Sequence, residues 1–182
     1  MTQHIALMGR ARAGKDTVAA RLVEPHGYTR IAFADPIKRM ALDIDPIMVA
    51  NHDWGPSVKR LSGVVEFWGW ERAKDQYPGV RRILQHIGQT VRDLDPEFWI
   101  RVALRELDSV SGPVVVTDVR YPNEAEALRA RGFRLVRVIR PGQDLTNSHA
   151  SETALDDYQP NAVVVNAGSL SELRMRADAL AA

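Results

Sequence analysis

The chain has 182 residues, a length that suits one domain with a small inserted lobe and a substantial buried core. Lysine and arginine (24) nearly balance aspartate and glutamate (23), so no overall basic field indicates a stable nucleic-acid partner. The lack of cysteine excludes disulfides, thiolate metal sites and a thiol nucleophile. Because no apolar run approaches about 18 residues and no leader pattern opens the chain, we expect a cytoplasmic protein with no membrane partner.

A Gly-x4-Gly-Lys segment runs from Gly9 to Lys15, between an apolar run and an amphipathic one. These flanks predict a strand over residues 4–8 and a helix from Val18 onward, the context that a phosphate-binding loop requires. The glycines let the backbone turn its N–H groups toward an anion, and Lys15 would add a charge for the β and γ phosphates of ATP. The residues expected to bind the nucleotide here are Gly9, Arg12, Ala13, Gly14, Lys15, Asp16 and Thr17.

Asp16 stands where this motif usually has a serine or threonine that binds magnesium, and the hydroxyl follows one place later in Thr17. A carboxylate also suits a hard cation, either directly or through its water shell, because Mg2+ prefers oxygen ligands. Farther along, three consecutive valines from residue 114 predict a central strand with both faces covered. Asp118 lies at its exit, where an acidic residue orients magnesium, so we expect a Mg2+ site made by Asp16, Thr17 and Asp118.

Arg120 follows two residues later and is the candidate for a charge that bridges donor and acceptor phosphates; an ordinary surface arginine is the alternative. Another strand is predicted over residues 134–140, and it ends with Arg140 near the nucleotide. The polar, turn-rich segment 141–160 comes next. It predicts either a mobile lid over the phosphates or a surface loop.

An acceptor site is expected earlier in the chain. Residues 28–33 predict a strand, after which Asp35 either caps the next helix or faces a ligand crevice at the end of the sheet. Lys38, one turn later, would meet a second anion there. Residues 45–79 have poor periodicity and many aromatics, which predicts an irregular helical insertion in which Trp68 either packs in a small core or stacks on a base.

The segment from Arg81 to Arg92 has a helical apolar stripe. Its polar face is either solvated or part of the site, with Gln85 bonding a base edge and Arg82 or Arg92 clamping a phosphate. We therefore define residues 45–92 as the insertion that binds the acceptor nucleotide.

A fifth strand is predicted over residues 162–166, and the turn from Asn166 to Gly168 would let the backbone approach an adenine ring. Five strands separated by helices predict a three-layer α/β fold with a parallel sheet. In such a fold the nucleotide binds across the carboxyl ends of the strands.

Taken together, these stretches resemble the P-loop nucleoside monophosphate kinases, and more closely the bacteriophage-type deoxynucleoside monophosphate kinases. The resemblance spans nearly the whole chain. Its most specific parts are the Gly-Lys-Asp-Thr ending of the loop and the string Asp-Val-Arg-x-Pro-Asn-Glu at 118–124. Supporting stretches are Phe33 to Lys38, Gln85 to Trp99, Ser148 to Glu152 and Asn166 to Gly168.

This resemblance implies transfer of the γ-phosphoryl group of ATP to the 5′-phosphate of a deoxynucleoside monophosphate, with Mg2+, in a host cytoplasm; relatives suggest a homodimer. An acceptor phosphate is already anionic, so no general base is required, and catalysis would come from positioning and charge neutralisation. The residues expected to carry it are Lys15, Arg12, Asp118 and Arg120. Two alternatives stay open: a kinase resembling dephospho-coenzyme A kinases, and a nucleotide-dependent ATPase or switch.

Overall fold

The computed structural model describes residues 3–52, 55–142 and 150–182. The chain divides into two units, one made by residues 1–33 together with 100–182 and the other by residues 34–99. Each unit has a hydrophobic core of its own.

A five-stranded parallel sheet forms the centre of the first unit, with the strand order β2-β5-β1-β6-β7. All four residues of β1 are fully buried between β5 and β6, which explains why that strand is continuously apolar. The parallel sheet predicted from the sequence is therefore confirmed. Its strands are β1 (Ile5–Met8), β2 (Thr29–Ile31), β5 (Val114–Val119), β6 (Arg134–Ile139) and β7 (Ala162–Val165).

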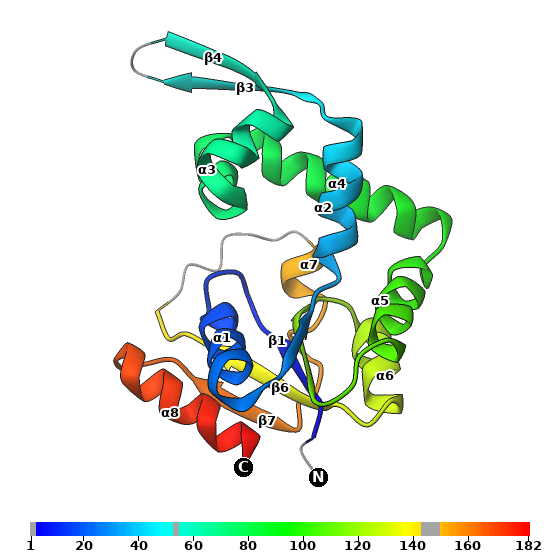
Figure 1. Ribbon diagram of the computed structural model, residues 1–182, viewed down its shortest axis with the longest axis vertical. Coiled ribbons are helices and arrows are strands. Elements are labelled where there is room, and N and C mark those ends of the chain that lie inside the picture. The colour runs from blue at the N-terminus through cyan, green and yellow to red at the C-terminus, as the bar shows by residue number, and fades with distance from the viewer. Residues whose placement is uncertain (1–2, 53–54, 143–149) are drawn as a thin grey trace. The chain divides into compact units, whose positions relative to one another are not determined.

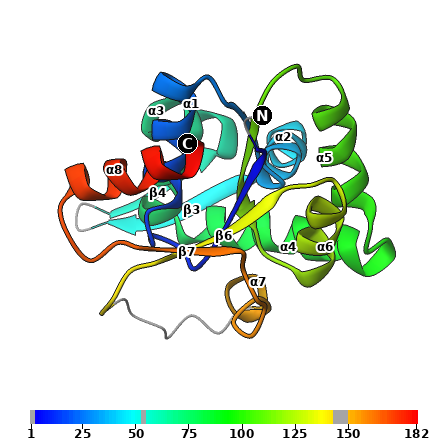
Figure 2. The same cartoon turned by 90° about the horizontal axis from the view of Figure 1, so that it is seen from below.

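Helices cover both faces of this sheet, as Figure 2 shows. On one face lie α1 (Lys15–His26) and α8 (Leu170–Ala181), and the buried side chains Leu22 and Leu173 join them to the sheet in one core. On the other face lie α6 (Pro122–Ala130) and the single turn α7 (Ala150–Thr153). The predicted three-layer α/β fold is thus confirmed.

The second unit consists of three helices and an antiparallel β-hairpin (Figure 1). Its helix α3 is kinked at Gly69, whose φ of 66° and ψ of 165° are not helical. The start of α5 (Phe98–Asp108) is tied to this unit, because the buried indole of Trp99 donates to the carbonyl oxygen of Gly88 at 3.0 Å. The elements are α2 (Ala34–Ile44), β3 (Ile47–His52), β4 (Gly55–Arg60), α3 (Leu61–Gln76) and α4 (Pro78–Leu94).

The prediction of an irregular helical insertion is wrong for residues 47–52 and 55–60, which form the paired strands β3 and β4. Burial alternates along β3: Ile47 and Val49 are 60% and 57% exposed, whereas Met48 and Ala50 are 7% and 5% exposed. This is the period of a strand with one covered face. All four residues are apolar, so the alternation in burial leaves no alternation in hydropathy for the sequence to show. From Leu61 onward the insertion is helical, as expected.

Among the helices of the described residues, none combines the length and the apolar character needed to cross a membrane.

An ion cluster fastens α8 to α1 at the edge of the first unit. Arg21 donates to both carboxylate oxygens of Asp178, at 2.7 and 3.0 Å, and the His26 ring nitrogen Nε2 lies 2.7 Å from Oδ1. These hydrogen bonds, that of Arg21 first, lower the pKa of Asp178 from 3.8 to about 2. The ionised carboxylate therefore stabilises the folded state.

We predict that Asp178→Asn lowers the thermal unfolding midpoint at pH 7 and that this difference from wild type shrinks in acid. The pKa of Asp178 is lower in the folded chain than in the unfolded one. Its stabilising contribution is therefore complete above about pH 4 and is lost as the pH falls toward 2. Thermal unfolding of both proteins between pH 7 and pH 3 checks this. A pH-independent difference, or the same behaviour in a control Asp43→Asn on the exposed side of α2, would contradict it.

Candidate phosphate-binding site

The loop that joins β1 to α1 has three residues with positive φ. Gly9 and Gly14 have φ values of 130° and 109°, and Arg12, which is exposed, has φ 62°. Gly14 caps α1, so the loop ends at the helix N-terminus, where backbone N–H groups and the helix dipole favour an anion. The loop is also held from outside, because the Asn166 side-chain amide donates to the carbonyl oxygen of Ala13 at 3.0 Å.

Gly9 is required by a close approach as well as by its backbone angle. A Cβ atom at this position would lie 2.3 Å from the carbonyl oxygen of Val138 in β6. Such a contact is impossible without moving the backbone of the sheet. Only glycine therefore lets the chain leave β1 along this path.

Lys15 is buried inside the loop, with 7% of its surface exposed. Its Nζ donates to the carbonyl oxygens of Gly9 and Arg10, each at 2.8 Å. Burial lowers the pKa of Lys15 from 10.5 to about 8, and the Arg120 charge adds to that effect. The charges of Glu152, Asp16 and Asp118 act in the opposite direction and raise the pKa. The Lys15 amine therefore experiences both a neighbouring cation and three carboxylates.

Arg120 reaches the same carbonyl group as Lys15. Its Nη1 lies 3.5 Å from the Gly9 carbonyl oxygen, 3.3 Å from that of Ser151 and 2.8 Å from the Glu152 carboxylate. The backbone beneath it is fixed by Glu124, a carboxylate only 1% exposed, which accepts the N–H of Arg120 at 2.8 Å. The structure thus brings Arg120 and Lys15 together at the end of β1.

Asp118 leaves β5 beside these cations, and its Oδ1 accepts the N–H of Phe33 at 2.8 Å. Asp16 is exposed in the first turn of α1, and Thr17 is half-buried next to it. The described residues contain no cluster of three or more histidine or carboxylate side chains arranged around a metal position. Magnesium at a nucleotide is usually held by one or two protein oxygens together with phosphates and waters, so these donors fit that kind of site.

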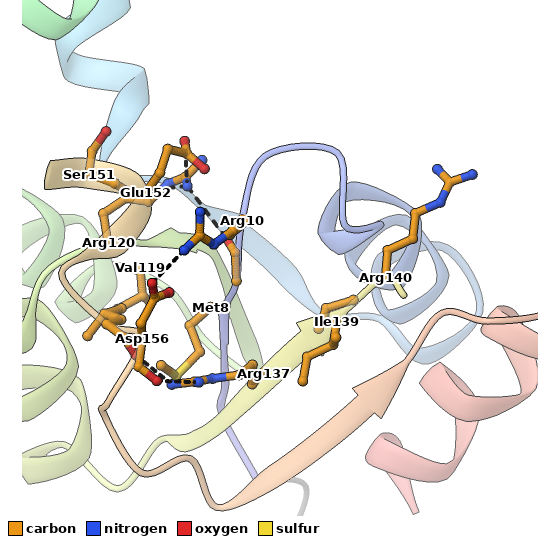
Figure 3. A pocket seen from close by; sticks show the side chains of 13 residues that line it. Met8, Arg10, Val119, Arg120, Arg137, Ile139, Arg140, Ser151, Glu152 and Asp156 are labelled. Carbon is orange, nitrogen blue, oxygen red and sulfur yellow. Dashed lines mark hydrogen bonds and ion pairs between the residues drawn. The ribbon is translucent and has the colours of Figure 1, made fainter. Parts of the chain in front are cut away.

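A pocket of about 160 Å³ opens next to this group, between the ends of β1, β5 and β6 and the segment that begins with α7 (Figure 3). Arg140, which the sequence analysis assigns to the nucleotide, lines this pocket, and its exposed guanidinium points away from Arg120 and Glu152. The pocket is lined by Met8, Gly9, Arg10, Val119, Arg120, Arg137, Val138, Ile139, Arg140, Ser151, Glu152, Leu155 and Asp156.

Glu152 is a member of this site that sequence reasoning did not single out. Its carboxylate is 8% exposed, pairs with Arg120 through Oε1 and accepts the N–H of Ala11 through Oε2 at 2.7 Å. The Ser148 to Glu152 stretch contributed to the family resemblance, but one glutamate in a polar loop has no spacing that marks a role. Of the predicted lid over 141–160, residues 143–149 lie outside the described part of the chain.

Gly168 has a local explanation in the structure. A Cβ atom there would lie 1.9 Å from the Glu172 carboxylate, which accepts the N–H of Ser169 at 2.6 Å in a capping box at the start of α8. The turn that begins at Asn166 therefore contacts α8 at one end and the loop between β1 and α1 at the other.

In the second unit, Asp35 and Lys38 form an ion pair of 3.2 Å at the start of α2. The Lys38 amine also lies 5.9 Å from the centre of the Trp70 ring, which places a cation over an aromatic face. Trp68, the residue predicted to stack on a base, is half-buried against the core of this unit. Its ring packs edge-on against that of Phe67, with the ring centroids 4.8 Å apart.

Three further acceptor-site candidates project from α4. Arg82 is exposed, while Gln85 and Arg92 are half-buried. Spacings of three and seven residues place them along one side of the helix. The guanidinium atoms Nε and Nη1 of Arg92 are shielded from solvent.

A parallel three-layer α/β fold with a Gly-x4-Gly-Lys loop after its central strand defines a P-loop kinase-like protein. A sequence model of the deoxynucleotide monophosphate kinase family matches residues 70–177, more than half of the chain. The chain belongs to the deoxynucleotide monophosphate kinase family.

The chain is also similar to individual viral proteins. The deoxynucleotide monophosphate kinase of Enterobacteria phage T4 is 35% identical over 106 residues, which are 55% of this chain and 44% of that protein. Uncharacterized protein ORF77 of Ictalurid herpesvirus 1 (strain Auburn) is 38% identical over 107 residues, 54% of this chain and 46% of its own. The match thus spans about half the length of these two relatives. A putative deoxynucleotide monophosphate kinase of Acanthamoeba polyphaga mimivirus is 27% identical over 176 residues, 92% of this chain and 90% of that one.

We predict that Gly9→Ala lowers the free energy of unfolding by roughly 3 kcal/mol or more. The added Cβ would collide with the backbone of Val138, and alanine would also have to adopt an unfavourable positive φ. A matched control is Gly112→Ala, which shares a positive φ (96°) but has no atom within 4 Å of the added Cβ. It should cost only about 1 kcal/mol. Urea unfolding of both variants measures the difference, and equal losses would contradict the close approach.

Proposed function

We propose that this chain transfers the γ-phosphoryl group of ATP to the 5′-phosphate of a deoxynucleoside monophosphate and releases ADP and the diphosphate. The observation that carries this proposal is the meeting of Lys15 and Arg120 at the Gly9 carbonyl oxygen, with Asp118 in electrostatic reach. Two cations at one end of a phosphate-binding loop suit a reaction in which negative charge shifts between two phosphates. Family membership supports the choice of acceptor.

In this mechanism the loop residues Gly9 and Ala13 to Lys15 hold the triphosphate through their N–H groups and the Lys15 charge. Arg12 and Arg120 neutralise the transferred group, with Arg120 between donor and acceptor. Asp16 or Thr17, together with Asp118, would hold Mg2+, which supplies charge neutralisation at the phosphates when bound. No general base is needed, because the acceptor phosphate already carries negative charge.

We assign acceptor binding to residues 45–92, with Asp35 and Lys38 preceding them. Gln85 would bond a base edge, Trp68 would stack on the base, and Arg82 or Arg92 would hold the 5′-phosphate. Arg140 and the turn from Asn166 to Gly168 are assigned to the ATP side, and residues 141–160 to a lid over the phosphates.

A coupled assay of ADP release, with ATP, Mg2+ and each deoxy- and ribonucleoside monophosphate in turn, tests the proposal. We expect turnover with one or more deoxynucleotides and at least a 1000-fold loss in Lys15→Ala, in line with loss of a main transition-state charge. A circular dichroism spectrum should show that the variant keeps its fold. Near-normal turnover in Lys15→Ala would reject the mechanism. ATP turnover without any acceptor would favour an ATPase, and phosphorylation of dephospho-coenzyme A would favour that other kinase class.

A second prediction concerns Arg120. Because its charge is assigned to the shifting phosphoryl group, Arg120→Ala should lower kcat about 100-fold or more and change the dissociation constant of ATP only a few-fold. Arg105→Ala, an exposed arginine in α5, serves as the control. An unchanged kcat in Arg120→Ala would move the bridging role to another residue.

A further inference from the structure

Glu152 places a carboxylate against the Arg120 guanidinium, which the proposed function assigns to the transferred phosphate, and against a backbone N–H of the loop between β1 and α1. Its Oε2 accepts the N–H of Ala11 at 2.7 Å, and its Oε1 lies 2.8 Å from Nη1 of Arg120. Ala11 belongs to the Gly-x4-Gly-Lys loop, and Figure 3 shows Glu152 and Arg120 facing one another above Arg10. The side chain of Glu152 is only 8% exposed, so its carboxylate is enclosed by the protein and its contacts are shielded from solvent.

The donors around Glu152 are those that recognise a phosphoryl oxygen. A backbone N–H at a loop before a helix N-terminus and a guanidinium both prefer anionic oxygens, and a carboxylate and a phosphate accept from them in similar geometry. The Lys15 amine is also within electrostatic reach of Glu152. A negative oxygen at this position is therefore stabilised whether a protein side chain or a nucleotide supplies it.

The segment that carries Glu152 is itself anchored to the site. Asp156 forms an ion pair of 2.5 Å with Arg10 of the loop. Arg137 of β6 donates to the carbonyl oxygens of Leu155, Asp156 and Tyr158 at 2.6, 2.8 and 2.5 Å. These contacts hold the turns after α7 beside the loop, so the Glu152 carboxylate is presented to Ala11 from a fixed base.

We propose that Glu152 is an internal stand-in for the phosphoryl group that is transferred, and that it leaves this position when ATP binds. This inference rests on the proposed function, because it takes Arg120 as the partner of that phosphoryl group. A carboxylate and a γ-phosphate cannot share the Ala11 N–H and the Arg120 guanidinium, since their like charges repel at hydrogen-bond distance. Glu152 therefore lowers the affinity for ATP. It lowers the affinity for ADP much less, because ADP lacks the transferred phosphoryl group.

The test is a calorimetric titration of wild type, Glu152→Gln and Glu152→Ala with ATP and with ADP, each in the presence of Mg2+. We expect both variants to bind ATP about tenfold more tightly than wild type, the size expected when one charge-assisted hydrogen bond no longer has to be broken before binding. ADP affinity should stay within about twofold. Glu24→Gln, which removes an exposed carboxylate from α1, should change neither affinity.

An ATP affinity that is unchanged or weaker in both Glu152 variants would overturn the inference, and so would an equal gain for ADP. Thermal unfolding of each variant confirms that it is folded before titration. If wild type binds ATP and transfers phosphate while the Glu152 variants show no gain, this inference alone falls. If wild type binds no ATP, the proposed function is contradicted, and the inference about Glu152, which rests on it, is contradicted as well.

Discussion

The carbonyl oxygen of Gly9 is the point on which the site depends, because it accepts hydrogen bonds from both Lys15 and Arg120. One of these cations begins α1 and the other follows β5, so a single backbone atom joins two elements that are far apart in sequence. The atom is available only because residue 9 is glycine and can pass beside Val138. Gly9 therefore determines both the path of the chain after β1 and the place where the two cations meet.

The positive charges of Lys15 and Arg120 repel each other at this distance, and neighbouring groups offset that repulsion. Burial and the Arg120 charge reduce the pKa of Lys15 to about 8, while carboxylates on three different elements counter them. Glu124 fixes the backbone of Arg120 from below, and Glu152 pairs with its guanidinium. These contacts hold both cations at the end of β1, where the proposed function needs positive charge.

Much of the fold and part of the candidate site can be predicted from the sequence, for specific physical reasons. The valines of β5 and the apolar residues of β1 are buried on both faces, so their strands stand out, and the loop between β1 and α1 follows from the spacing of Gly9, Gly14 and Lys15. The sequence did not predict strand β3 of the hairpin, because its exposed residues Ile47 and Val49 are as apolar as its buried residues Met48 and Ala50. Glu152 was missed for a different reason: its role comes from tertiary contacts with Ala11 and Arg120, which no local pattern encodes.

Following the phosphoryl group itself tests directly whether the site transfers it from ATP to a deoxynucleotide. Wild-type protein is incubated with Mg2+, a panel of deoxynucleoside monophosphates and ATP labelled with 32P at the γ position, and the products are separated. We expect the label in the β-phosphate of a deoxynucleoside diphosphate. Label that stays in ATP, or that is released only as inorganic phosphate, would contradict it.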